Sequence, residues 1–324
     1  MKEYIGHPSQ VSGIEEHILV GGKGNGMRLL QVRTAAGLEF TVSLDRCADL
    51  SRVSFKGVNA GYFAPCGYVA PAFYDNKGAG FLKSFTAGFL TTCGLTAVGS
   101  PCVDDGEELP LHGNISNTPA EEVSYKKESG KIIINAVIRD ASLFGNQLLL
   151  KRTYECEEDG SSITITDVCE NVGPKTSPLM TLYHFNMGYP LLSENSVVDI
   201  PAEKVVPRDD HAAEEMVNYL KMEKPQADFV ERCYYHTVKA VDGKATVSIK
   251  NPDAKIGLEM EYGADELSKF TEWKMMGSGE YVLGLEPGNC TPDGRDVMRA
   301  SGELHFLKPG ESETHTIKLT FFEV

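Results

Sequence analysis

Apolar and polar residues alternate along most of this chain, and a period of two is typical of half-buried β-strands. Residues 27–34 and 38–44 alternate in this way on either side of an Ala-Ala-Gly turn, which predicts a β-hairpin. Short turns rich in Gly, Asp and Ser separate the later alternating stretches. The same pattern predicts further strands at 131–139, 146–156, 161–171 and 314–322.

Strands that follow one another through short turns, without crossover helices, favour antiparallel sheets. The pattern therefore predicts an all-β fold, a large antiparallel β-sandwich with few short helices. Helical patterning is confined to residues 211–220 and part of 229–236. No linker or low-complexity tract interrupts the sequence, so we expect residues 1–324 to form a single domain.

The composition and net charge indicate which kind of partner the protein binds. Hydrophobic residues make up 41% of the chain and charged residues 24%, as in an ordinary globular protein. The formal net charge is −15, from 31 Lys and Arg against 46 Asp and Glu, which argues against binding to nucleic acid or to an anionic membrane. We expect a small-molecule partner; the sequence carries no signal for an oligomeric state.

The first residues, Met-Lys-Glu-Tyr-Ile-Gly, lack the apolar core of a signal peptide, and no apolar run is long enough to span a bilayer. A cytoplasmic location is the expectation. The eight cysteines are scattered without a Cys-x-x-Cys pair, which favours reduced and mostly buried thiols. A metal site formed by Cys66, Cys93 and Cys102 together with a histidine is the alternative, but the irregular spacing of the cysteines argues against it. We expect neither a metal nor a cofactor.

Two apolar strands each carry one group suited to proton transfer. The segment Pro178–Pro190 is continuously apolar and contains His184, and the strand that starts at Tyr281 ends on Glu286 before a loop of turn-forming residues. An imidazole and a carboxylate on neighbouring strands provide a general acid and a general base. The alternative is that His184 is a packed core residue.

A third segment, Leu109–Ala120, contains Leu-His-Gly at positions 111–113. It ends a stretch from Gly57 to Gly113 that is rich in Gly, Pro and aromatic residues. Long loops of this composition on a rigid sheet often form binding surfaces. They are equally compatible with loops that pack over the end of a sheet.

These three segments, in this order, resemble the galactose mutarotase (aldose 1-epimerase) superfamily, most closely a branch known as a domain of unknown function. The resemblance covers residues 38–321. It implies that His112 binds a sugar, that His184 is the general acid and that Glu286 is the general base of a reaction that opens and closes the sugar ring without a cofactor.

The sequence departs from the better-characterised epimerases after His112, where Gly-Asn-Ile-Ser-Asn replaces their Asn-Arg motif. Lys83 and Arg46 are candidate cations for the missing arginine, and surface salt bridges are the alternative for both.

The remaining candidates for sugar binding have structural alternatives of their own. Arg295 is expected either to pair with Glu286 or to contact substrate, unless it is simply solvated on its loop. Trp273 offers an aromatic face to a sugar, although a single tryptophan is often a core residue. Asp209, followed by Asp210, lies where related epimerases have an acidic turn.

The leading hypothesis is a cofactor-independent carbohydrate isomerase of the aldose 1-epimerase type. One alternative is a carbohydrate-binding protein that has the same fold and no turnover. A second alternative is another acid/base reaction of sugars on this scaffold, such as an epimerisation beside a carbonyl or a lyase step.

Overall fold

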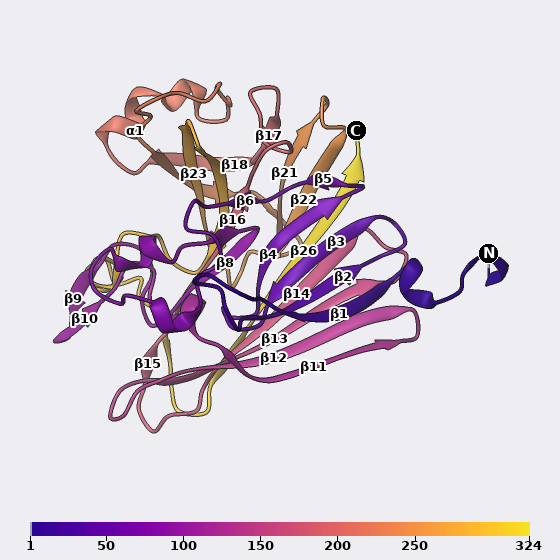
Figure 1. Ribbon diagram of the computed structural model, residues 1–324. Coiled ribbons are helices and arrows are strands. Elements are labelled where there is room, and N and C mark those ends of the chain that lie inside the picture. Colours follow the sequence, from indigo (N-terminus) through magenta and orange to yellow (C-terminus); the bar gives the residue numbers. More distant parts are fainter. Residues whose placement is uncertain (1) are drawn as a thin grey trace.

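The computed structural model describes residues 2–324, and it confirms the all-β prediction: strands dominate and the helices are few and short. Three antiparallel sheets of five, nine and six strands form the molecule (Figure 1). Among the described helices, none is both long and apolar enough to cross a membrane.

The five-stranded sheet contains the hairpin predicted around Gly37, with β2 paired to β3. Its strands, in spatial order, are β1 (Gly13–Ile18), β2 (Arg28–Arg33), β3 (Leu38–Ser43), β4 (Asp49–Phe55) and β5 (Val58–Asn59).

The nine-stranded sheet contains the predicted strands 131–139, 146–156, 161–171 and 314–322. One of its strands, β20 (Ala240–Val241), pairs only with β21 at the side of the main path. That path runs β11 (Ala120–Glu128), β12 (Lys131–Ala141), β13 (Gln147–Glu157), β14 (Ser162–Asn171), β26 (Ser312–Glu323), β22 (Ile256–Gly263), β21 (Lys244–Asn251) and β17 (Val197–Asp199).

The six-stranded sheet carries the two segments with His184 and Glu286. Its strands, in spatial order, are β18 (Ala202–Pro207), β19 (Arg232–Val238), β23 (Lys269–Gly277), β24 (Glu280–Gly288), β16 (Met180–Met187) and β8 (Leu90–Leu95). Much of the loop region between residues 57 and 119 gathers beside β8 and β16 (Figure 1). This region contains two small two-stranded sheets, one formed by β6 (Tyr62–Phe63) and β7 (Ala87–Gly88) and the other by β9 (Cys102–Asp104) and β10 (Glu107–Leu109). A third two-stranded sheet, outside this region, pairs β15 (Ser177–Pro178) with β25 (Phe306–Leu307).

Three details of the helix prediction require correction. The helix predicted at 211–220 is shorter and divided into α1 (Asp210–Glu214) and a 3₁₀ turn (Met216–Asn218). The segment 229–236 contributes to strand β19 instead of a helix. A second α-helix, α2 (Arg295–Ala300), lies where we expected only loop. Further 3₁₀ turns span Lys2–Tyr4, Pro8–Gln10, Pro71–Phe73, Gly80–Lys83 and Ile115–Asn117.

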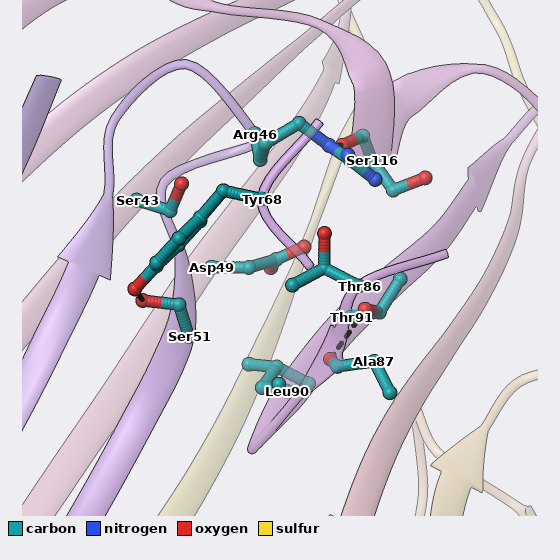
Figure 2. Close-up of a pocket in the computed structure, with 11 residues that line it drawn as sticks. Ser43, Arg46, Asp49, Ser51, Tyr68, Thr86, Ala87, Leu90, Thr91 and Ser116 are labelled. Carbon is teal, nitrogen blue, oxygen red and sulfur yellow. Dashed lines mark hydrogen bonds between the residues drawn. The ribbon is translucent and has the colours of Figure 1, made fainter. Parts of the chain in front are cut away.

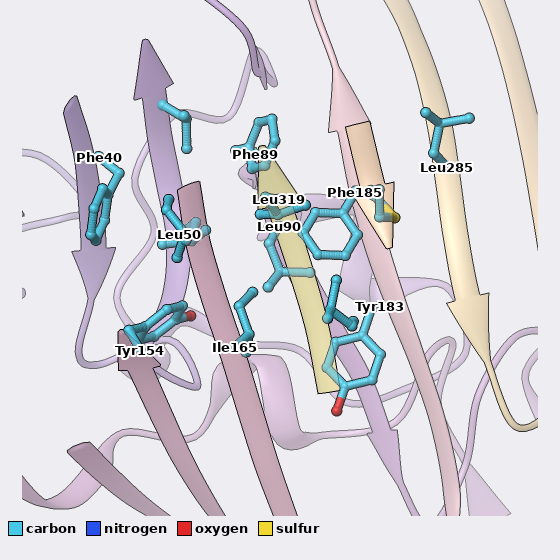
Figure 3. Close-up of a cluster of buried hydrophobic side chains, with 14 of the residues drawn as sticks. Phe40, Leu50, Phe89, Leu90, Tyr154, Ile165, Tyr183, Phe185, Leu285 and Leu319 are labelled. Carbon is cyan, nitrogen blue, oxygen red and sulfur yellow. The ribbon is translucent and has the colours of Figure 1, made fainter. Parts of the chain in front are cut away.

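One hydrophobic cluster draws on all three sheets. Phe40 and Leu50 come from the five-stranded sheet, Ile165 from the nine-stranded sheet, and Phe185 and Leu285 from the six-stranded sheet (Figure 3). Every one of these side chains is buried. Burial of apolar area on this scale is the main favourable term in folding, and here it holds the sheets against one another.

A buried cation lies at the junction of the three sheets. The guanidinium of Arg152 on β13 donates to Asp49 on β4 at 2.6 Å and to Asp167 on β14 at 2.6 and 2.9 Å. It also donates to the hydroxyl of Thr92 on β8 at 2.8 Å. Asp167 in turn accepts a hydrogen bond of 2.8 Å from the hydroxyl of Tyr183 on β16.

We predict that Arg152→Met lowers the free energy of unfolding by about 3–5 kcal/mol, because it leaves two buried carboxylates without their cation. Denaturant unfolding followed by circular dichroism measures the effect. The matched control is Lys151→Met on the same strand, whose half-exposed ammonium pairs with Glu170. That exposed pair should contribute less than about 1 kcal/mol. Equal losses in the two variants would contradict the role assigned to Arg152.

Candidate active site

His184 and Glu286 lie side by side on two adjacent interior strands of the six-stranded sheet, β16 and β24. β16 and β24 are antiparallel, and Leu182 pairs with Gly288 while Phe185 pairs with Leu285. This register sets positions 184 and 286 opposite each other. Because side chains alternate along a strand, His184 faces away from the core that its neighbours Tyr183 and Phe185 enter.

The two side chains are in direct contact. Nε2 of His184 lies 3.2 Å from Oε1 of Glu286, and both side chains are almost fully buried. Neither Nδ1 of His184 nor Oε1 of Glu286 has a well-aligned hydrogen-bond partner among the described residues, and the same holds for nearby Oγ1 of Thr271 and Oδ1 of Asn186. Buried polar atoms are usually paired, and unpaired ones that cluster often mark a functional site.

Burial determines the charge state of this pair. It lowers the pKa of His184 to about 3, and the neighbouring His112 contributes in the same direction. Burial also raises the pKa of Glu286 well above its usual range, assisted by the negative charge of Glu231. Burial therefore favours the uncharged form of both groups, in which the carboxyl of Glu286 can donate a proton and the imidazole of His184 can accept one.

His112 approaches the pair from the loop region. Its backbone has a φ of 58°, in the left-handed region that few residues other than glycine adopt. The ring lies 5.8 Å from that of His184 between centroids, and burial lowers its pKa to about 4. The backbone N–H of Gly99 donates to its Nδ1 over 3.4 Å, so the neutral ring carries its proton on Nε2 and can donate from there.

These residues line a cavity of about 240 Å³, a size that suits one sugar ring. Trp273 on β23 and Phe85 flank His184, with ring centroids 5.2 and 5.3 Å from the imidazole. The structure thus brings together four of the predicted site residues, His112, His184, Glu286 and Trp273.

Two charged residues that sequence reasoning missed also line the cavity, namely Arg208 and Glu231. Glu231 accepts a hydrogen bond of 2.6 Å from the indole N–H of Trp273 and lies 3.3 Å from the guanidinium of Arg208. Arg208 immediately precedes the acidic turn at Asp209 and Asp210, and this position is the one feature of the sequence that could have pointed to it. No feature of the sequence pointed to Glu231.

The family model described as "Domain of unknown function (DUF4432)" matches residues 24–321. This chain belongs to the DUF4432 family. No curated protein matches the chain significantly.

Solved structures match the DUF4432 protein over nearly all of its length. A "putative aldose 1-epimerase" from Klebsiella pneumoniae subsp. pneumoniae has a TM-score of 0.90 at 26% identity, over 96% of this chain and 83% of that chain. A galactose mutarotase-like protein from Clostridium acetobutylicum has a TM-score of 0.71 at 18% identity, over 97% and 100%. A galactose 1-epimerase from Lactobacillus acidophilus NCFM has a TM-score of 0.64 at 14% identity, over 96% and 99%. The fold is galactose mutarotase-like, as the sequence resemblance implied.

Arg46 does not line the cavity of this DUF4432 protein, contrary to expectation. It is buried beside a separate small cavity of about 20 Å³ (Figure 2). Its guanidinium donates to the backbone carbonyls of Ser116, Val69 and Ser84 at 2.6, 2.9 and 2.9 Å. Arg46 therefore fastens the loops that bear His112 and Phe85, and its expected contact with the sugar is replaced by a structural one.

Three other expected binding residues also lie outside the cavity lining. Lys83 points to solvent and pairs with Asp75 at 2.8 Å. Arg295 is buried at the start of α2, where it donates to Asp104 at 2.6 Å instead of pairing with Glu286.

Asp209 is the third expected binding residue that lies outside the cavity lining, and its contacts give it a structural role. Its carboxylate accepts the backbone N–H of Ala212 at 2.8 Å, which caps α1, and it also accepts from Nε of Arg208 at 3.1 Å. It positions Arg208 rather than facing the cavity.

The carboxylate of Glu286 occupies space that exists because residue 284 is glycine. A Cβ at this position would lie 2.2 Å from Oε1 of Glu286 and 2.9 Å from Cβ of Trp273. We predict that Gly284→Ala moves the carboxylate away from His184, so that a crystal structure of the variant shows their 3.2 Å contact broken.

The matched control is Gly13→Ala on strand β1, where a Cβ would meet only ordinary contacts of 3.5 and 3.6 Å with Ser9. It should leave the contact between His184 and Glu286 unchanged. An unmoved carboxylate in the Gly284→Ala variant would contradict the steric argument.

Proposed function

We propose that this protein is a cofactor-independent sugar isomerase that interconverts the anomers of a neutral aldose. The observation that carries the proposal is the contact between His184 and Glu286, two buried groups at the wall of a cavity the size of one sugar ring. The fold shared with galactose mutarotase-like proteins supports the same reaction class.

The reaction needs one donor and one acceptor at adjacent oxygen atoms. To open the ring, a proton is added to the ring oxygen as its bond to the anomeric carbon breaks, and the anomeric hydroxyl loses its proton to become a carbonyl oxygen. Both oxygens are attached to the same carbon, so the two catalytic groups should lie next to each other instead of on opposite walls. The contact of 3.2 Å meets that requirement.

The protonation state favoured by burial makes Glu286 the first donor and His184 the first acceptor. The reverse assignment, with His184 as acid and Glu286 as base, is reached when the proton crosses their contact. After rotation about the bond between C1 and C2, the ring closes on the other face and both transfers run backwards. Each residue therefore donates once and accepts once in a cycle, and the pair ends as it began.

The surrounding residues orient the sugar. His112, with its proton on Nε2, is suited to donate a hydrogen bond to a sugar oxygen, and Trp273 offers an aromatic ring to a C–H face. Arg208 supplies hydrogen-bond donors, but Glu231 and Asp209 balance its charge. With no excess positive charge in the cavity, the site favours a neutral sugar over a phosphorylated or acidic one.

The proposal is tested by the rate of exchange between anomers, measured by proton NMR with a panel of free aldoses. We expect the protein to accelerate exchange, and we expect His184→Asn and Glu286→Gln each to lower kcat by about 10²–10⁴-fold, the usual contribution of a general acid or base. His17→Asn and Glu15→Gln, exposed on the distant strand β1, serve as controls. Sugar binding without acceleration would instead support a carbohydrate-binding protein, and a new product would support another sugar reaction.

The pH dependence of the rate follows from the pKa shifts that burial causes in His184 and Glu286. The rate should fall in acid as the pair gains a second proton, towards the pKa of about 3 at His184. It should fall again in alkali when the pair loses its proton, at a pH raised well above the usual range of a glutamic acid by the burial of Glu286. The expected profile of kcat/KM is a bell with a plateau across neutral pH. A maximum confined to mildly acidic pH would contradict the assigned charge state.

A further inference from the structure

A second, larger cavity adjoins the one that holds His184 and Glu286. Its volume is about 420 Å³, and four residues line both cavities: Leu82, Phe85, Glu231 and Trp273. The second cavity does not reach the catalytic pair. The two cavities are therefore adjacent, with Trp273 at their boundary.

The wall of the second cavity continues the face of the six-stranded sheet. Trp273 and Met275 alternate on β23, and Val282 is on the adjacent strand β24, so their side chains share one face of the sheet. The indole of Trp273 is held by its hydrogen bond to Glu231 and does not have to be ordered when a ligand arrives. It offers a fixed aromatic surface at the boundary between the two spaces.

The charges of the second cavity restrict what it can hold. Its lining includes two carboxylates, Glu231 and Glu280, and no lysine or arginine among the described residues. A phosphate or carboxylate group would be repelled there, whereas the hydroxyl groups of a sugar can donate hydrogen bonds to carboxylates. Aromatic and apolar side chains beside such acceptors match a sugar ring, which has C–H faces and hydroxyl edges.

We infer that the substrate is a neutral reducing disaccharide or longer saccharide. Its reducing-end ring occupies the cavity of His184 and Glu286, and its second ring occupies the cavity lined by Trp273 and Met275. The anomeric hydroxyl of the first ring remains free for ring opening, so the second ring is attached through a hydroxyl remote from C1. This inference rests on the proposed function and specifies its substrate class.

The test compares disaccharides with their own reducing-end monosaccharides. Anomer exchange is measured by NMR for lactose, cellobiose, maltose and melibiose, each against glucose. For at least one linkage we expect kcat/KM to exceed that of glucose by about tenfold, because the second ring makes contacts of its own in the second cavity. Ala64→Phe places a bulky ring in the second cavity and should reduce this ratio to about one. Ala300→Phe, exposed on α2, is the matched control and should preserve the ratio.

Ratios at or below one for every disaccharide, or a ratio that Ala64→Phe leaves unchanged, would overturn the inference. Calorimetric binding of the same sugars separates it from the proposed function. If no sugar is turned over, the isomerase proposal fails; the second cavity is then still supported by tighter binding of a disaccharide that Ala64→Phe removes. Equal affinities for glucose and all four disaccharides would overturn the inference that the second cavity binds a sugar ring.

Discussion

The structure depends on one buried cation that all three sheets share. Arg152 is fully enclosed, and its donors reach Asp49 of the five-stranded sheet, Asp167 of its own sheet and Thr92 of the six-stranded sheet. A buried charge of this kind is tolerated only when its partners are correctly placed. A shift of any one sheet would leave donors or carboxylates unpaired, so the network restricts how the sheets can pack.

The network also restricts the position of the candidate active site. Tyr183 donates to Asp167 on the core side of β16, and His184, the next residue, faces the cavity. A slip of one residue in the register of β16 would turn the imidazole into the core and the phenol into the cavity. His184 and Glu286 are thus held by two adjacent interior strands, which give them a more exact position than loops would provide.

The sequence was most informative where local pattern decides structure. Alternation predicted four strands of the nine-stranded sheet and the hairpin around Gly37, because a half-buried strand must alternate whatever its neighbours are. The pattern was wrong at 229–236, where pairing of Cys233 with Trp273 on β23 imposes a strand. Helix α2 was not predicted, because its six residues are too few to show a helical period and they follow a loop rich in Gly and Pro.

In the candidate site, too, the sequence predicted some features and not others. His184, Glu286 and Trp273 project from one face of a sheet, and that face follows from the strand pattern once the register is known. Sequence reasoning did not predict the directions of long charged side chains. Arg46 and Arg295 turn to carbonyl and carboxylate acceptors that lie 23 to 199 residues away in the chain, and such partners exist only after the chain has folded.

His184 and Glu286 lie on strands, whereas much of the cavity rim comes from connecting segments. Phe85 and Leu82 belong to the loop before β8, and Arg208 and Glu231 flank the excursion between β18 and β19. Loops accept insertions and substitutions more readily than central strands do. Variation in these loops can therefore change the shape of the cavity while His184 and Glu286 keep their positions on the strands.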